Sequence, residues 1–289
     1  MSTPSLSALP IRRLTPRDLT SCADLSEDRG WPREEHKWGL LLRAGAGYGI
    51  DDPDGEGLIG VFVVTRYGPQ ERPDLAAIGM VLVAERYARR GIGRRLMQYA
   101  VEQEAPVPLT LHATPHGRPL YEQLGFKVIG RAEMVCGRLV PSGPLPGIAT
   151  RPATAEDLTA ILRLDTDVFG HDRTHVITRL PAFTDQLRVA EAGGEIIGYA
   201  GAWPNMETHV VGPLIARDTQ TAKALIASLG AHTDRPLRTD IDVRHEELLA
   251  WVKESGLEPV AFNAVMAYGM PELPGDWTRR FAPLTVAAG

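Results

Sequence analysis

The chain has 289 residues, of which 31 are Lys or Arg and 36 are Asp or Glu, giving a formal net charge of −5. This length suits two domains, and the acidic balance argues against wholesale binding to nucleic acid or to an anionic membrane. Hydrophobic residues make up 44% of the chain, enough for a buried core, which excludes general disorder. The 29 glycines and 23 prolines predict many turns and disfavour a helical bundle.

The two cysteines, Cys22 and Cys136, cannot form a disulfide framework or a Cys-x-x-Cys metal site. Residues 1–10 lack the basic start and the apolar core of a signal peptide. No uninterrupted run of about 18 apolar residues is present, so no membrane-spanning helix is expected. We therefore expect a soluble, reduced, cytoplasmic protein.

The first elements of the chain recur at an offset of 139 residues. In each copy a short strand leads into a threonine that can cap a helix, and an acidic residue three positions later imitates a capping box. The matching positions are Arg12/Arg151, Thr15/Thr154, Asp18/Asp157 and Leu19/Leu158.

Apolar strands follow in the same order in both copies. Residues 57–64 echo residues 195–202, and residues 78–83 line up with residues 211–216. Each copy reads helix, helix, several adjacent strands, helix, strand, helix, strand, which favours a mixed α/β or α+β sheet over a doubly wound parallel one. The turn-rich stretch 141–147 separates the copies, so we predict two domains, 1–145 and 146–289.

A glycine loop follows the strand predicted over residues 76–83. Gly91 and Gly93 precede a helix with apolar spacing, and free N–H groups at a helix start form an anion site. A dinucleotide fingerprint is excluded because Leu96 stands where a third glycine is needed, and a Walker loop is excluded because Arg94 follows Gly93.

Five arginines surround this loop in an otherwise acidic chain. They favour a polyphosphate site, whereas the alternative is a solvated basic helix face behind an ordinary turn. They are Arg86, Arg89, Arg90, Arg94 and Arg95.

Two segments together resemble motifs A and B of the GNAT superfamily of N-acetyltransferases. The acetyl-CoA loop of that superfamily, Gln/Arg-x-x-Gly-x-Gly/Ala, matches residues 88–93 at every position except Ala88. Its Leu-Tyr-Glu-x-Leu-Gly-Phe block matches residues 120–126 throughout. The resemblance is specific over about residues 75–130, and the repeat extends it to the second half. It implies two GNAT-like domains, each a mostly antiparallel, centrally splayed sheet flanked by helices.

The resemblance also implies the roles of site residues. Main-chain groups of Val81 and Val83 would pair with the pantetheine arm of acetyl-CoA, and Tyr121 would donate a proton to the departing thiolate. A phenol is protonated at neutral pH and can serve as that acid. The alternative for Tyr121 is an aromatic side chain packed on its helix. The residues that would hold the pyrophosphate are Arg89, Arg90, Gly91, Ile92, Gly93 and Arg94.

The residue that takes the proton of the attacking amine is left open, because residues 76–83 contain no glutamate. A water chain to solvent would also suffice. The polar candidates are Glu34, Glu35, His36, His112 and His116. The aromatic residues Trp31, Trp38 and Tyr48 fit a substrate-lining helix or core packing equally well.

The second copy lacks these features. Its loop, residues 217–223, is shorter and has no glycine, and it carries Asp218 where a phosphate would need positive charge. Aligning residues 255–257 with residues 124–126 places Val252 opposite Tyr121. This half resembles the YitH-like C-terminal domain of tandem acetyltransferases, and we expect a degenerate domain that walls the groove, supports the fold or mediates dimerisation.

These observations predict an N-acetyltransferase that moves the acetyl group of acetyl-CoA to a primary amine of a small molecule or peptide. No metal is expected, because His171 and His175 do not make a zinc-protease motif. A homodimer is left open. The alternatives are another acyl-CoA as donor and a non-catalytic CoA-binding sensor or interaction module. Nucleic-acid binding through the arginines is disfavoured, because they are needed around one loop.

Overall fold

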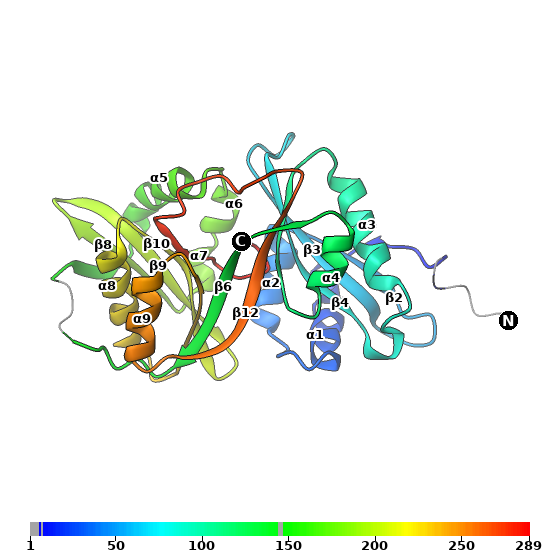
Figure 1. Cartoon of the computed structure of the whole chain (residues 1–289), viewed down its shortest axis with the longest axis horizontal. Helices are drawn as coiled ribbons and strands as arrows, with labels where there is room; N and C mark the ends of the chain where they lie inside the picture. The colour runs from blue at the N-terminus through cyan, green and yellow to red at the C-terminus, as the bar shows by residue number, and fades with distance from the viewer. Residues whose placement is uncertain (1–5, 7, 144–146) are drawn as a thin grey trace.

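The structure, a computed structural model, describes residues 6, 8–143 and 147–289. Two halves lie side by side, with strands β6 and β12 running between them (Figure 1). The elements of the first half are β1 (Arg12–Arg13), the 3-10 turn η1 (Pro16–Asp18), α1 (Leu19–Asp28), α2 (Glu35–Ala44), β2 (Ala46–Asp51), β3 (Leu58–Tyr67), β4 (Leu75–Val83), the 3-10 turn η2 (Glu85–Tyr87), α3 (Ile92–Glu104), β5 (Leu109–Ala113), α4 (Arg118–Gln123) and β6 (Lys127–Gly137).

The second half repeats this order with two short helices in the place of α2, with no counterpart of η2 among the described residues, and with a final strand added. Its elements are β7 (Ala149–Pro152), the 3-10 turn η3 (Ala155–Asp157), α5 (Leu158–Phe169), α6 (Thr174–Ile177), α7 (Leu180–Phe183), β8 (Gln186–Ala192), β9 (Glu195–Asn205), β10 (Thr208–Ala216), α8 (Thr219–Gly230), β11 (Leu237–Asp242), α9 (Glu246–Glu254), β12 (Glu258–Tyr268) and β13 (Arg280–Ala282). The predicted order of helices and strands is confirmed for the first half. In the second half, α6 and α7 stand in the place of the second predicted helix, and β13 follows the last predicted strand.

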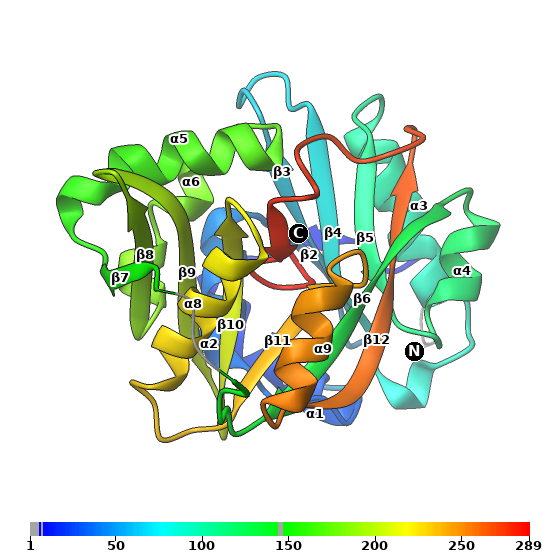
Figure 2. The same cartoon turned by 60° about the vertical axis from the view of Figure 1, so that its left-hand side comes forward.

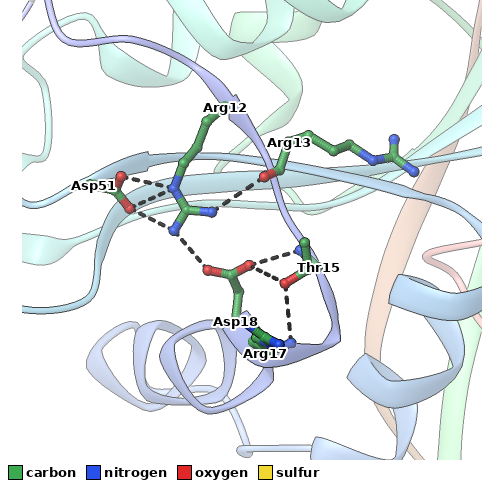
Figure 3. Close-up of polar contacts among 6 residues, drawn as sticks. All are labelled: Arg12, Arg13, Thr15, Arg17, Asp18 and Asp51. Atoms are coloured by element: carbon green, nitrogen blue, oxygen red, sulfur yellow. Dashed lines mark hydrogen bonds and ion pairs between the residues drawn. The ribbon is translucent and has the colours of Figure 1, made fainter.

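The predicted capping box at the start of the first copy is present. Figure 3 shows the Asp18 carboxylate accepting hydrogen bonds from the Thr15 amide at 2.7 Å and from the Arg12 guanidinium at 2.7 Å. Arg12 also donates to Asp51 at the end of β2, at 2.9 Å. The capped turn is thereby tied to the neighbouring strand.

The second copy builds the same device. Arg151 donates to Asp157 of the capping box and to Glu191 of β8, both at 2.6 Å. Neither Asp51 nor Glu191 belonged to the predicted repeat, although each follows its box by a similar number of residues. The duplication therefore extends to an ion-pair network as well as to helix caps.

The strands of the described residues form one 13-stranded sheet with the order β1-β2-β3-β4-β5-β12-β6-β11-β10-β9-β8-β7, and β13 pairs with β10. Two pairs of strands are parallel, β4 with β5 and β10 with β11. The remaining pairs are antiparallel. A mixed α/β fold with a mostly antiparallel sheet is confirmed, and the sheets of the two halves join into one.

The two halves exchange their last long strands. Strand β12 of the second half lies between β5 and β6 of the first, and β6 lies between β12 and β11 of the second (Figure 2). Each half thus completes the sheet of the other, because the edge of β5 and the edge of β11 would otherwise remain unpaired. The predicted boundary falls in the connection after β6, where residues 144–146 lie outside the described residues.

Each half has a splayed point in its sheet. Strand β4 pairs with β5 only through residues 76–78, and it then continues to Val83 without β5 beside it. Strand β10 pairs with β11 only through residues 209–211 and continues to Ala216.

The segment after β13 returns to the first half and is buried between the halves. Trp203 donates to the carbonyl of Leu284 at 3.2 Å, and Tyr67 donates to that of Ala288. A Cβ atom added to Gly79 of β4 would overlap the main chain of Ala287, so only glycine allows this close approach. Residues 284–289 therefore cover β4 near its splayed point.

Of the aromatic residues Trp31, Trp38 and Tyr48, the last two pack in the core. Trp38 is fully buried and donates to the Ser26 hydroxyl at 3.0 Å. Tyr48 stacks on Phe62 with ring centroids 5.1 Å apart, whereas Trp31 remains 38% exposed. Within the described part of the chain, no helix has the length and apolar character needed to cross a bilayer.

Candidate active site

The main chain of β4 offers an open edge at the splayed point. Leu82 pairs with Val61 of β3, and the Ala84 amide donates to the Ile59 carbonyl at 2.9 Å. Since hydrogen-bonding direction alternates along an antiparallel strand, the N–H and C=O groups of Val81 and Val83 point away from β3, into the gap. Both residues are partly exposed, unlike the buried residues before them in β4.

The equivalent edge in the second half is closed. Strand β13 pairs there, with Ala282 opposite Leu214, and the Ala216 amide donates to the Arg279 carbonyl at 3.0 Å. Leu214 and Ala216 hold the places of Val81 and Val83, because Gly198 pairs with Ala216 as Gly60 pairs with Val83. An added strand therefore fills one gap and leaves the other free.

The glycine loop places free amides beside the open edge. Gly91 caps α3 with a φ of +84°, a left-handed conformation that glycine adopts without strain. The first helical hydrogen bond runs from the Arg95 amide to the Gly91 carbonyl at 3.0 Å. The amides of residues 92–94 consequently have no partner in the helix and point toward its N-terminal side, where the helix dipole favours an anion.

The loop, α4 and the end of β4 converge. A Cβ atom added to Gly93 would lie 3.5 Å from Leu120 Cδ2 and 3.6 Å from Val83 Cγ2. The two predicted motifs, separated in sequence, therefore meet at the open edge of β4.

The five loop arginines are not equivalent. Arg86 pairs with Asp52, and Arg95 donates to the carbonyls of Leu6 and Leu9. These two arginines therefore connect the loop and α3 to other segments of the first half. Arg90 lies over the Tyr87 ring, with its guanidinium carbon 5.3 Å from the ring centroid. The guanidinium groups of Arg86 and Arg95 thus already have partners within the protein, and the role of the five arginines as a phosphate site stays a prediction.

Tyr121 lies on α4 and is 8% exposed. Burial alone raises the pKa of its phenol to about 12, so the hydroxyl keeps its proton at neutral pH. Its ring packs edge-to-face on Phe126 with centroids 6.1 Å apart. The residue is thus both a packed aromatic and a protonated phenol.

Comparisons with known proteins agree with this geometry. Two family models, each described as an acetyltransferase (GNAT) domain, match residues 57–137 and residues 161–282. The chain belongs to the GNAT acetyltransferases. GNAT acetyltransferases use acetyl-CoA as co-substrate, so the chain is an acetyl-CoA-dependent acyltransferase with tandem GNAT domains.

Relatives of this GNAT protein share its length and arrangement. The chain is 28% identical over 225 residues to the uncharacterized N-acetyltransferase YitH of Bacillus subtilis, which covers 76% of this chain and 77% of that one. A putative acetyltransferase from Pyrococcus horikoshii has a TM-score of 0.81 at 19% identity, covering 100% and 99% of the two chains. A tandem GNAT protein from the clavulanic acid biosynthesis pathway has a TM-score of 0.65 at 15% identity, covering 91% and 99%. These structures share the fold.

The second GNAT domain lacks the phenol and the glycine loop. The Leu257 amide bonds to the Val252 carbonyl at 3.0 Å, just as the Phe126 amide bonds to the Tyr121 carbonyl at 3.0 Å. The alignment of Val252 with Tyr121 is therefore confirmed. Asp218 caps α8 by accepting from the Thr221 amide at 2.8 Å, so a carboxylate already occupies this helix start.

The candidate acceptors for the proton of the attacking amine differ in their position and in the partners that they already have. Glu34 pairs with Lys37 and Asn205, and Glu35 accepts from Arg33 at 3.1 Å. His36 bonds to the Phe183 carbonyl at 2.6 Å and stacks on the Phe183 ring, against the second half. His116 is exposed. His112 is the candidate that lies at the splayed point of β4 and β5, one residue past the last pair.

His171 and His175 of the second half do not lie on one helix face. His175 lies in α6, whereas His171 precedes that helix and approaches Asp74 at 3.6 Å. Within residues 8–143 and 147–289, no cluster of three or more His, Cys, Asp or Glu side chains is placed to hold a metal ion.

Proposed function

We propose that the first half, residues 1–145, transfers the acetyl group of acetyl-CoA to a primary amine of a small molecule or a peptide. The observation that carries this proposal is the open main-chain edge of Val81 and Val83, beside the glycine loop. A pantetheine arm contains two amide groups, which can pair with such an edge as an added strand does. In the second half, β13 makes this kind of pairing with β10.

The start of α3 would hold the pyrophosphate. The free amides of Ile92, Gly93 and Arg94 supply hydrogen-bond donors, and the left-handed turn at Arg89, with a φ of +59°, and Gly91 exposes the main chain before them. Arg90 supplies positive charge nearby. Arg94 reaches Gln123 of α4, which ties the loop to the helix that carries Tyr121.

Tyr121 would act as the general acid. The amine nitrogen forms a bond to the thioester carbon while the carbon–sulfur bond breaks, and the departing thiolate takes the phenolic proton. The burial that raises the pKa of Tyr121 keeps the phenol protonated throughout the physiological range, as this role requires.

The second half, residues 146–289, would not hold a second acetyl-CoA. Its strand edge is filled by β13, its loop has no glycine, and Val252 replaces the phenol. It would instead form one wall of the site for the acceptor amine, where the segment after β13 lies against Gly79. A homodimer and a cytoplasmic location stay predictions.

Isothermal titration with acetyl-CoA tests the assignment of the site to one half. We expect one strong site per chain, with thiol release when a panel of primary amines is added. Two equal sites, or none, would contradict the asymmetric proposal. One site without thiol release across the amine panel would favour the CoA-binding sensor instead.

A further inference from the structure

Tyr87 stands directly before the glycine loop, and no role described so far explains it. It is the last residue of η2 and is buried, whereas Arg86, Arg89 and Arg90 beside it are exposed. A buried phenol among exposed arginines needs partners for its hydroxyl and for its ring. Both sets of partners are present.

The hydroxyl of Tyr87 is held by the turn between β2 and β3. It lies 2.8 Å from Asp54 Oδ2 and 3.1 Å from Asp52 Oδ1, so its one proton is donated to this pair of carboxylates. Two further bonds close the turn, from the Asp54 amide to Asp52 Oδ1 at 3.0 Å and from the Asp52 amide to the Gly57 carbonyl at 3.1 Å. The place of the phenol is therefore fixed by a segment that is distant in the sequence.

The ring of Tyr87 carries two guanidinium groups. The guanidinium carbons of Arg86 and Arg90 each lie 5.3 Å from the ring centroid, within the range of a cation–π interaction. Arg86 also pairs with Asp52, so that arginine is held twice. For Arg90, the ring is the one polar or charged contact made with the described residues. Contact with a ring face leaves the N–H groups of a guanidinium free to donate elsewhere.

This arrangement leaves one fixed positive charge beside the start of α3. Arg90 directly precedes Gly91, which caps α3, and the free amides of the helix follow. Arg86 balances the charge of Asp52, whereas Arg90 has no carboxylate partner within residues 8–143 and 147–289. Its charge is therefore available to an anion at the helix start.

The second half lacks the parts of this arrangement. Its turn between β8 and β9 consists of Gly193 and Gly194, with no carboxylate, and residues 217–218 between β10 and α8 include no aromatic residue. The phenol, the two acids and the glycine loop thus occur together in one copy. This favours a shared function over a packing role that both copies would need.

We propose that Tyr87 positions Arg90 for the diphosphate of acetyl-CoA, a role that rests on the proposed function. Asp52 and Asp54 fix the phenol through its hydroxyl, and the ring holds the guanidinium. The N–H groups of Arg90 then donate to phosphate oxygens, in addition to the amides at the start of α3. Tyr87 acts through Arg90 and is a positioning residue. The loop thereby gains a fixed cation although Ala88 replaces the Gln or Arg of the GNAT motif.

Two substitutions separate the ring from the hydroxyl. Tyr87→Leu removes both, and we expect the Kd for acetyl-CoA to rise about tenfold. Tyr87→Phe keeps the ring and should raise this Kd about threefold. Tyr99→Phe is the control, because Tyr99 lies on α3 and its hydroxyl makes no hydrogen bond with the described residues. Its Kd should equal that of the wild type, as measured by titration calorimetry.

S-acetyl-pantetheine distinguishes positioning from packing, because it lacks the diphosphate and the nucleotide. Its Kd should be the same in the wild type and in Tyr87→Leu, since Arg90 has no phosphate to bind. In an Arg90→Gln background, Tyr87→Phe should raise the Kd for acetyl-CoA no further, because the hydroxyl acts through Arg90.

Each outcome decides between the roles. An unchanged Kd for acetyl-CoA in Tyr87→Leu, or an equal loss for S-acetyl-pantetheine, would overturn the role of Tyr87 and leave the proposed function standing. If Tyr87→Leu does not unfold cooperatively, Tyr87→Phe with and without Arg90→Gln decides, and additive effects overturn the role. Failure of the wild type to bind acetyl-CoA would overturn both.

Discussion

The amide of Ala216 donates a hydrogen bond to the carbonyl of Arg279 at 3.0 Å. Val83 is the equivalent of Ala216 in the first half, and no strand of the described residues pairs with it on that side. The same duplicated strand thus ends once in an intramolecular pairing and once in a free edge. The two halves therefore differ here in what the main chain pairs with. The side chains of Val83 and Ala216 play little part in this difference.

This pair of residues provides a matched test of the open edge. Val83→Pro removes an amide that we assign to acetyl-CoA, so its Kd should rise about fivefold, as expected for one lost hydrogen bond of about 1 kcal/mol. Ala216→Pro removes the bond to Arg279 and should lower the free energy of unfolding by about 1–3 kcal/mol with the Kd unchanged. Titration calorimetry and denaturant unfolding measure the two effects. Equal Kd changes in both variants would contradict the assignment.

The left-handed turn at Gly91 makes a second prediction. A Cβ atom in this conformation costs about 1–2 kcal/mol, and relieving the strain would turn the following amides away from the phosphates. Gly91→Ala should therefore raise the Kd for acetyl-CoA about tenfold. Gly194→Ala, at a φ of +82° between β8 and β9 of the second half with open space around it, carries the same strain outside the loop and should change stability alone. If both variants bind acetyl-CoA equally well, the loop does not hold the pyrophosphate.

Tyr121→Phe separates catalysis from binding. The variant keeps the ring that packs on Phe126 and loses the acid, so kcat should fall about 100-fold while the Kd for acetyl-CoA stays within twofold. Tyr268→Phe is the control, because the Tyr268 ring also packs on Phe126, with centroids 5.3 Å apart. Steady-state kinetics of both variants decide the role, and unchanged kcat in Tyr121→Phe would remove it.

The pH dependence of the wild type follows from the same residue. Burial raises the pKa of Tyr121 to about 12, so the phenol loses its proton only above that pH. We therefore expect kcat at saturating amine to show no alkaline decline between about pH 7 and pH 10. A decline with a midpoint near pH 9 that Tyr121→Phe abolishes would mean that the phenol titrates in a more exposed setting.

The exchange of β6 and β12 predicts how the halves fold. Strand β12 pairs with β5 through five residues and with β6 through nine, and a first half alone would lose both sets of hydrogen bonds. Fragments 1–143 and 147–289 should co-purify when expressed together, and each alone should lack a cooperative unfolding transition. Circular dichroism and thermal unfolding measure this. A fragment 1–143 that unfolds cooperatively and binds acetyl-CoA would show that the exchange is dispensable.

Local patterns carried the sequence predictions that proved correct. The capping boxes at Asp18 and Asp157, the glycine at the start of α3 and the turn after Tyr121 depend on residues within a few positions of one another. Spacing rules describe such interactions well, because the chain itself holds the partners close. The duplication could be recognised for the same reason.

The sequence analysis did not find interactions between residues that are far apart in the chain. Arg86 and Arg95 belong to the arginine cluster around the loop. The guanidinium group of Arg86 pairs with Asp52, and that of Arg95 donates to the carbonyls of Leu6 and Leu9. Asp51 and Glu191 complete the repeated ion pairs but stand far from Arg12 and Arg151 in the sequence. The offset of the repeat was the signal that could have found them.

The length and the repeat determined a duplicated chain with a glycine loop and a phenol in one copy. Tertiary structure alone decided that the halves exchange β6 and β12, that β13 closes the edge of β10, and that His112 lies at the gap of β4. The physical reason is that a strand edge presents the same N–H and C=O groups whatever its side chains are. Which segment pairs with it depends on the path of the whole chain, and that path closed one of two equivalent edges and left the other open.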